Sequence, residues 1–462
     1  MINAIITKFR SVVDRYFSPN GTSDSISDWY PELISEKSSD EDSWENEVSV
    51  ARCRNVSDVD VISGALNREG FNIVQSGVGV KSPNDDFNSM FALWSKVPSM
   101  FDISGDNNLK QALRLIVRAW RTDGEAFLVR HFYKTESAVP ICFEILPVDA
   151  IDMSRDNNDD IVRGIRYDKA TGRKKGYFFY EDGNNSFKSR EIDAGRVIHT
   201  SMKKAIGRKR GSPTLAASAT STRDMKQYVD FERLAAKVHS CISFFLKTDS
   251  PEAYKKLKEE GKIPLPKFLQ PGKVFALPMG TSVANSGQQR PTTSFEPFVQ
   301  SILQFISTSI NHAYPNFSGN YERSSYSAAR MATIEERVAF KFFQSELISQ
   351  VITPVVLMVA QACQIAGHLP PDIDLYAFAY QDTTYLPPGF DWVDPLKEAK
   401  SIEILVEKKY MTLTKLLGDK GIDFAKHVEQ LKEEAEAMYE LEKIYFEIRK
   451  MRGEVDSESN AR

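Results

Sequence analysis

The sequence lacks the short motifs that mark several common enzyme classes. It contains no GxxxxGK[ST] phosphate-binding loop, no HExxH or GxSxG motif, and no Cys/His pattern with zinc-ligand spacing. Its six histidines are scattered along the chain. These absences exclude an ATP-driven motor of the P-loop type, and they leave no candidate catalytic residue, cofactor or metal site.

Closely spaced cysteines, long apolar runs and an excess of basic charge are also missing. Cys53, Cys142, Cys241 and Cys363 are far apart and form no CxxC pair, which is typical of reduced thiols in a protein assembled in a cytosol. No apolar run reaches about 18 residues, so we expect no transmembrane helix and no membrane partner. The net charge is −4, so the chain lacks the overall basic character of many nucleic-acid-binding proteins.

The composition that is present suits a chain with several folded parts. The 462 residues are 42% hydrophobic and 26% charged, and this length predicts roughly three domains. Residues 1–47 begin with an amphipathic segment, whose charges are not typical of a secretory signal, and continue as a Ser- and acid-rich stretch. We expect the amphipathic segment to dock onto a partner or another subunit, with membrane attachment as the lesser alternative.

Residues 48–212 predict an α+β domain. Segments with helical apolar spacing come first, and alternating segments at 141–151, 161–169 and 174–182 are typical of antiparallel strands. Between a helix and a strand stands Asp123-Gly124-Glu125, an acid pair that would suit catalysis but is better interpreted as a turn.

A basic cluster near the end of this region has three interpretations. It could contact DNA phosphates, form a solvated turn, or pair with the acidic N-terminal segment. Its members are Lys203, Lys204, Arg208, Lys209 and Arg210.

Two long helical segments flank a short insertion. Ser212 and Pro213 suit the N-cap and first position of a helix over 213–247, and a second helix is predicted over 294–314. At 1.5 Å per residue the first would span roughly 50 Å, a length typical of helices that line an assembly or cross a domain. The intervening residues 248–293 contain a short helical segment, an apparent strand and several prolines, and predict a small α/β unit.

A polar loop over 315–327 precedes a long apolar helix. The loop is rich in Asn, Ser, Gly and Tyr, which favour turns. Beyond it, Met331, Ile334, Val338 and Phe342 recur at spacings of three and four and form one apolar stripe. On pattern alone the simplest interpretation is a surface loop before a core helix, and Pro354 predicts a kink further along.

The C-terminal third predicts one strand and then helices. Residues 375–383 suggest a strand paired with distant sequence, and Asp394-Pro395 suits the N-cap and first position of a helix. The nearby acids have no histidine at ligand spacing, so we reject a metal site there. Residues 396–451 predict two or three helices, the last resembling a coiled coil, and the tail 452–462 is expected to be disordered.

Several of these segments resemble, in the same order, motifs of the lambda-type portal proteins of tailed bacteriophages. Residues 319–321 (GNY) and 326–330 (YSAAR) resemble the family's G-D/N-Y loop and N-Y-S-S/T-A-R helix start, with Ser325 where the family usually has Asn. Residues 392–398 (WVDPLKE) resemble W-x-D-P-x-K-E. Shorter likenesses occur at Arg52 and Arg54, at residues 123–125, and at residues 207–213, so the resemblance covers most of 50–440.

The resemblance implies an α+β portal fold assembled as a ring. Its parts would be a wing (48–212), a first stem helix (213–247), a clip (248–293), a second stem helix (294–314), a tunnel loop (315–327), a kinked core helix with a strand returning to the wing (328–395) and crown helices (396–451).

The resemblance also implies a function without catalysis. Such a protein forms a dodecameric ring at one vertex of the capsid, is assembled in the host cytoplasm, resides in the virion, and conducts DNA during packaging and ejection. Expected partners are further copies of the chain, double-stranded DNA, the terminase large subunit, the major capsid and scaffolding proteins, and head–tail adaptors. The alternatives are a ring-forming adaptor of another tail or secretion machine and, less favoured, an acid-dependent nuclease or hydrolase.

Three segments receive candidate sites from the resemblance. The tunnel loop would present to DNA the residues Asn316, Ser318, Asn320, Tyr321, Glu322, Arg323, Ser324 and Ser325. Candidate DNA-facing cations on the first stem helix are Arg223, Lys226, Arg233 and Lys237. The clip would meet terminase and adaptors through Lys255, Lys256, Lys258, Lys262 and Lys267. A loop with little net charge suits contact with passing DNA, because affinity from counterion release grows with the number of phosphate contacts.

Overall fold

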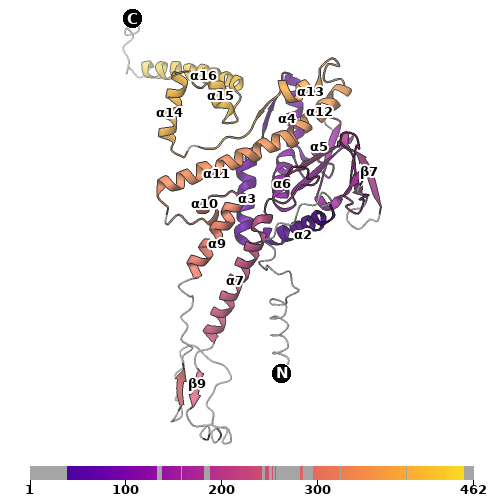
Figure 1. Ribbon diagram of the computed structural model, residues 1–462. Helices are drawn as coiled ribbons and strands as arrows, with labels where there is room; N and C mark the ends of the chain where they lie inside the picture. The colour runs from indigo at the N-terminus through magenta and orange to yellow at the C-terminus, as the bar shows by residue number, and fades with distance from the viewer. Residues whose placement is uncertain are drawn as a thin grey trace. The chain divides into compact units, whose positions relative to one another are not determined.

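The computed structural model describes residues 39–132, 138–157, 159–181, 188–241, 245–248, 281–284, 295–322, 324–391 and 393–451, with Glu252 and Lys255 (Figure 1). The chain divides into two units, Met1–Val48 and Ser49–Arg462, and the elements discussed below belong to the second, except that α2 (Ser39–Ser57) begins in the first. The predictions for the N-terminal amphipathic segment, most of the clip, Arg323 and the C-terminal tail lie outside the described residues. So do those for Lys256, Lys258, Lys262 and Lys267.

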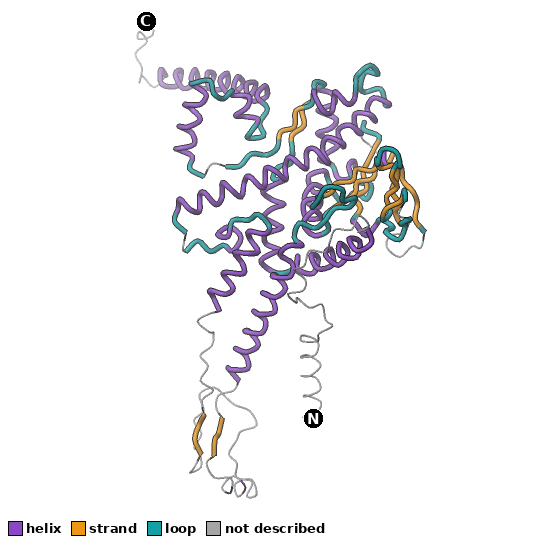
Figure 2. The backbone as a smooth tube through the Cα atoms, viewed as in Figure 1, coloured by secondary structure: helices purple, strands orange, loops and turns teal. Residues whose placement is uncertain are grey.

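Two antiparallel sheets confirm the predicted α+β character of residues 48–212. In the first sheet, β2 (Glu125–Phe132) lies between β3 (Ile141–Leu146) and β8 (Val197–Ser201), so that Phe127 is opposite both Leu146 and His199. The second sheet has the order β4 (Ile161–Val162), β5 (Ile165–Tyr167), β6 (Lys174–Tyr180) and β7 (Ser189–Asp193). Figure 2 shows these strands together in one part of the molecule.

Helices before and between these strands supply the core. They are α2 (Ser39–Ser57), α3 (Asp60–Val74), α4 (Asp85–Lys96), α5 (Pro98–Phe101) and α6 (Leu109–Thr122). Asn108 and Gln111 form a reciprocal capping box at the start of α6, which satisfies otherwise unpaired backbone N–H groups. The fully buried Trp94 and Trp120 belong to one apolar cluster with residues of the later helix α12 (Thr353–Ile365), so the sheet-bearing part and the C-terminal half share a core.

The first predicted stem helix is shorter than expected at both ends. Helix α7 runs over Ala216–Cys241, not 213–247, and it lies beside α9 (Phe295–Ser309) (Figure 1). The amides of Thr214 and Leu215 instead bond to the carbonyls of Trp120 and Arg121 at the end of α6, which holds this segment outside the helix. After α7, β9 (Phe245–Thr248) pairs with β10 (Thr281–Ala284), so the predicted helical residues 245–247 are strand.

The second stem helix and the tunnel loop also need corrected bounds. Helix α9 ends at Ser309, and a short helix α10 (Tyr314–Ser318) occupies the start of the predicted loop. Pro315 stands in the first turn of α10, where its missing N–H leaves no bond unmade. The irregular part of the loop is therefore 319–325.

A nearly continuous helix follows the loop. It comprises α11 (Tyr326–Leu347), a π-helical turn η4 (Ile348–Ile352) and α12 (Thr353–Ile365). Pro354 stands at the start of α12, directly after the π-turn, and both features are recognised causes of helix bending. By length and composition the span Tyr326–Ile365 could cross a membrane, although half of its most apolar window is buried inside the fold, as in the core helix of a soluble protein.

The apolar stripe on α11 does not face the core of the chain. Met331, Ile334, Val338 and Phe342 are all exposed, with exposed fractions of 66%, 40%, 65% and 55%. The buried face carries Glu336, Phe340, Phe343, Gln344 and Leu347. The interpretation of this stripe as a core face is therefore wrong for the single chain, because the opposite face packs on α3 and the aromatic core.

The strand predicted over 375–383 is also wrong. Asp374 accepts hydrogen bonds from the amides of Tyr376 and Ala377 and begins a helical segment, α13 (Leu375–Ala377) with a π-turn η5 (Phe378–Asp382). The strand β11 (Thr384–Leu386) comes afterwards and pairs antiparallel with β1 (Gly79–Lys81).

The predicted C-terminal helices are confirmed. They are α14 (Pro395–Glu407), α15 (Leu413–Gly418) and α16 (Phe424–Met451). Asp394 caps α14 by accepting a hydrogen bond from the amide of Lys397, as its sequence position predicts.

Candidate functional site

The loop 319–325 connects α10 to α11 with its own local hydrogen bonds. Gly319 ends α10 in the left-handed region, with φ of 70°, which glycine adopts without steric cost. Ser325 begins α11 by accepting a hydrogen bond from the amide of Ala328. The residue that departs from the family's usual Asn therefore still provides a capping oxygen.

The side chains of the loop make few contacts with the fold. Asn320 accepts a hydrogen bond from the amide of Glu322, and Tyr321 donates its hydroxyl to Asn316 at 2.9 Å. Tyr321, Glu322 and Ser325 are exposed, so the loop presents a phenol, a carboxylate and hydroxyls to its surroundings.

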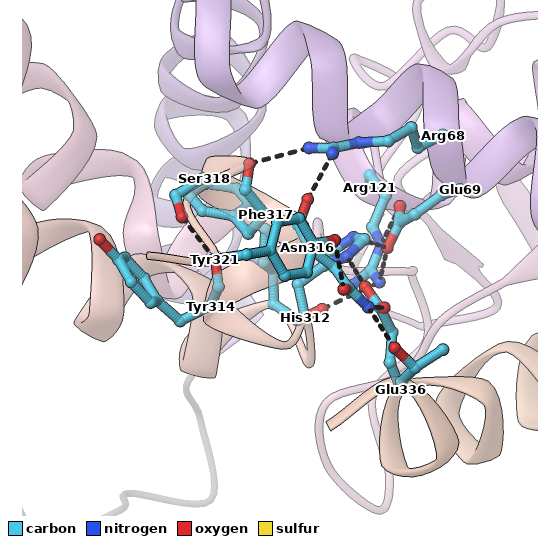
Figure 3. A network of polar contacts seen from close by, with 12 residues as sticks. Arg68, Glu69, Arg121, His312, Tyr314, Asn316, Phe317, Ser318, Tyr321 and Glu336 are labelled. Atoms are coloured by element: carbon cyan, nitrogen blue, oxygen red, sulfur yellow. Dashed lines mark hydrogen bonds and ion pairs between the residues drawn. The ribbon is translucent and has the colours of Figure 1, made fainter. Parts of the chain in front are cut away.

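The base of the loop is held against α3 and α11. Arg68 donates to the carbonyls of Asn316 and Phe317, the latter at 2.8 Å. The amide of Asn316 donates to Glu336 on α11 and, at 3.4 Å, to Thr333 (Figure 3). Residue 316, which the sequence predicts as a DNA-contacting loop residue, therefore anchors the loop.

Beneath this anchor lies a buried group of charges contributed by three helices and the segment after α9. His312 is 2.9 Å from Glu69 of α3 through its Nε2 and 2.5 Å from Glu336 of α11 through its Nδ1. Arg121 of α6 makes a bidentate pair with the same Glu69, one of whose hydrogen bonds measures 2.9 Å. Figure 3 shows these side chains converging next to Asn316.

The titration of this group is set by its neighbours. Burial alone would raise the pKa of Glu69, but Arg121 and His312 together hold that pKa below its usual value. Burial would lower the pKa of His312, but hydrogen bonds to Glu336 and Glu69 outweigh it and raise the pKa.

Two cavities lie near the loop, one lined in part by the loop itself and one at its base. One of about 350 Å³ lies between α9 and the loop and is lined by polar residues such as Gln304, Asn320 and Ser324. The other, of about 200 Å³, lies over the buried charges and is lined in part by Arg68, His312 and Glu336.

The Asp-Gly-Glu turn and the basic cluster meet at a second buried site. Arg210 makes a bidentate pair with Glu125, one of whose hydrogen bonds measures 2.7 Å, and His199 lies 2.9 Å from the same carboxylate. Gly124 has φ of 84°, and a Cβ there would lie 2.4 Å from the backbone of Ser212, so the turn needs glycine.

This contact settles two expectations from the sequence. The turn interpretation of residues 123–125 is confirmed. Arg210 is 6% exposed and pairs within the fold, so its assignment to DNA phosphates, a solvated turn or the acidic N-terminal segment is wrong.

The remaining predicted site residues that the structure describes lie apart from the loop. Arg223, Lys226, Arg233 and Lys237 are exposed along α7, with Arg223 next to Asp224 at 3.1 Å and Arg233 at 3.8 Å from Asp230. Lys255 is exposed as well. Five residues that hold the loop had no distinctive local sequence signal. Four are charged side chains on helices, namely Arg68, Glu69, Arg121 and Glu336, and the fifth is His312 in the segment after α9.

Comparison with known proteins decides the family. The model of the family described as "Phage portal protein, lambda family" matches residues 22–344. The chain belongs to the lambda family of phage portal proteins.

Individual relatives of this portal protein are distant. It is similar to the "Probable portal protein" of Halomonas phage phiHAP-1, with 22% identity over 353 residues. That match covers 72% of this chain and 66% of the relative, so the chain spans just under two thirds of the relative's length. Chains from the virion of a native gene transfer agent particle and from the neck of an empty particle each share 13% identity with it. Their TM-scores are 0.45 and 0.46, and each match covers 81% of this chain and 93% of the other.

The two strongest family motifs of this portal protein lie against each other. Arg330, which ends the helix-start motif, is 4.0 Å from Asp394 and 3.6 Å from Glu398 of the second motif. Two turns along α11, Arg337 donates to the carbonyl of Asp391 at 2.8 Å and lies over the ring of Phe390. Helix α11 therefore holds the segment that leads into α14.

Proposed function

We propose that this portal protein forms a dodecameric ring at one vertex of a phage capsid and that double-stranded DNA passes through the ring during packaging and ejection. The observation that carries the proposal is the lambda-family match over residues 22–344. Two structural features support it. Helices α7 and α9 lie side by side, and α11 exposes an apolar stripe of the kind that marks a protein–protein contact.

The partners follow from the same proposal. The ring docks the terminase large subunit and later the head–tail adaptors, with Lys255 and the neighbouring lysines of residues 248–293 as the contact. The ring also meets the major capsid and scaffolding proteins, and it is assembled in the host cytoplasm. Exposed rim charges of this kind act mainly on the rate of encounter.

The alternative of an adaptor ring in another tail or secretion machine predicts a ring as well. The hydrolase alternative finds no support in the described ranges, where no group of three or more His, Cys, Asp or Glu side chains could hold a metal ion. Negative-stain images of the purified protein test the proposal first, because we expect hollow rings. Particles that stay monomeric at several salt concentrations would overturn it.

Deletion of residues 318–323 separates a portal from an adaptor ring. Residues 318–322 bury little surface, so we expect the deletion to leave folding and rings intact while reducing the DNA packaged or retained by particles. A matched control replaces the same residues with a Gly/Ser segment of equal length, which keeps the spacing but removes Tyr321 and Arg323. Full-length genomes packaged and retained at the normal rate by both variants would refute a channel role for the loop.

A further inference from the structure

His312 bridges two carboxylates that belong to different helices. Its Nε2 is 2.9 Å from Glu69 on α3, and its Nδ1 is 2.5 Å from Glu336 on α11. A neutral imidazole has one N–H and one lone pair, so it can donate to only one of two ionised carboxylates. The geometry therefore requires an imidazolium, which donates to both.

The charges around this bridge balance only when the proton is present. The side chains of His312, Glu69, Glu336 and Arg121 are 3%, 2%, 7% and 3% exposed. With His312 protonated, two buried cations face two buried carboxylates. Without the proton, one carboxylate loses its cation in a place where unpaired charge is costly.

The other cations near His312 are engaged elsewhere and do not supply Glu336 with a positive charge. Arg68 of α3 is engaged with the carbonyls of Asn316 and Phe317, and Arg337 of α11 is engaged with the carbonyl of Asp391. Arg121 of α6 reaches Glu69. Glu336 thus depends on His312 for its cationic partner.

The bridge continues to the loop through a chain of hydrogen bonds. Glu336 accepts from the amide of Asn316, and the side-chain oxygen of Asn316 accepts from the hydroxyl of Tyr321 at 2.9 Å (Figure 3). The cavity of about 200 Å³ that is lined by His312, Asn316 and Glu336 gives this carboxylate room to turn away.

We propose that protonated His312 holds Glu336 in place and that Glu336 and Asn316 position the loop 319–325, so that loss of one proton releases the loop. His312, Glu336 and Asn316 are then positioning residues for Tyr321. The release itself is a property of the chain, and only its consequence for DNA rests on the proposed function.

Hydrogen–deuterium exchange of the assembled full-length protein tests this release. We expect the exchange of peptides covering 317–326, corrected for the intrinsic effect of pH, to rise at least about tenfold across a series from about pH 6 to about pH 9. The neighbouring carboxylates raise the pKa of His312, so its proton is lost on the alkaline side of the usual histidine range. In the His312→Gln variant the loop should exchange fast at both ends of this range. The matched control His368→Gln, at an exposed histidine, should keep the wild-type step.

A second variant keeps the test decisive if His312→Gln fails to fold. Glu336→Gln removes the carboxylate that needs the proton, so its loop exchange should not depend on pH. Corrected exchange of the wild-type loop that stays flat with pH, or a step that persists in either variant, would overturn the proposal. If the step is present while the loop deletion leaves packaging normal, the release stands and the channel role of the loop fails.

Discussion

At the scale of single residues, two buried histidines differ in charge because their neighbours differ. His312 faces two carboxylates and holds its proton. His199 faces Glu125 and the amine of Lys174, which lies 2.7 Å from its Nδ1. Burial, reinforced by Lys174 and Arg210, lowers the pKa of His199 to about 4 despite the bond to Glu125. His199 is therefore neutral at pH 7, with Nε2–H donating to Glu125 and Nδ1 accepting from Lys174.

His199 should make the fold sensitive to mild acid. Unfolded His199 takes up a proton near pH 6.5 and folded His199 only near pH 4, so the free energy of unfolding should fall as pH drops between these values. Because the pKa of Glu69 is lowered in the folded protein, protonation of Glu69 reduces the free energy of unfolding further only below about pH 4.5. His312 affects stability in the opposite direction. Its contribution to the free energy of unfolding is complete below pH 6.5 and is lost as pH rises through its raised pKa.

Urea denaturation at a series of pH values measures this decline. In the His199→Phe variant, the decline in the free energy of unfolding between about pH 6.5 and about pH 4.5 should disappear. If the variant retains the wild-type slope in that window, another group titrates there.

The Arg210–Glu125 pair offers a direct stability test. Arg210→Met should destabilise the protein by about 3–5 kcal/mol, because it leaves Glu125 buried with half its partners. Lys204→Met, at an exposed position in the same basic cluster, should change stability by no more than about 0.5 kcal/mol. Equal losses in the two variants, measured by denaturant unfolding, would contradict the buried pairing.

The sequence revealed the residue types of these sites but not their pairing. Arg210 stands among four other cations with the same local pattern, and its partner Glu125 is 85 positions away. His312 meets Glu69 across 243 positions. Such pairs depend on how elements distant in the sequence pack together, which local spacing does not encode. The Gly124 turn was predictable because its constraint is local.

At the scale of elements, the sequence predicted helix starts well where a cap and a proline coincide, as at Asp394-Pro395. It failed at Ser212-Pro213, where tertiary hydrogen bonds to α6 keep residues 214 and 215 out of the helix. It also failed at 375–383, because alternation of apolar residues over a short stretch suits a helical turn as well as a strand. The cap at Asp374 was the better local signal there.

The cap at Asp394 can be tested through its helix. Asp394→Ala removes the bond to the amide of Lys397 and the approach to Arg330, so it should cost about 1 kcal/mol and speed hydrogen exchange in the first turn of α14. Asp391→Ala is the matched control, since Asp391 is exposed and contributes its backbone carbonyl to Arg337. Identical exchange in both variants would show that the cap does not hold this helix.

At the scale of the whole molecule, the exposed stripe on α11 is an apolar surface that a single chain leaves uncovered. Its periodicity was visible in the sequence, yet periodicity cannot say whether a face packs within the chain or against another copy. We expect the stripe to be covered in the proposed ring, since closed rings form by repeated contacts between different faces of neighbouring subunits.

Mass photometry of stripe variants tests that expectation. Val338→Lys places a charge in the middle of the stripe, so it should shift the population from rings to monomers without lowering the melting temperature of the monomer. Val338→Leu keeps the surface apolar and should assemble like the wild type. Rings formed equally by both variants would place the subunit contact elsewhere.

The π-turn at Ile348–Ile352 has a consequence for how this gene can vary. A π-turn accommodates one residue more than an α-helical turn, and each residue rotates a helix by about 100°. The number of residues in the turn therefore fixes the angle, about the helix axis, between the exposed stripe of α11 and the buried surface of α12. Point substitutions leave that angle unchanged, whereas insertion of one further residue in this turn would turn one of the two surfaces away from its neighbour.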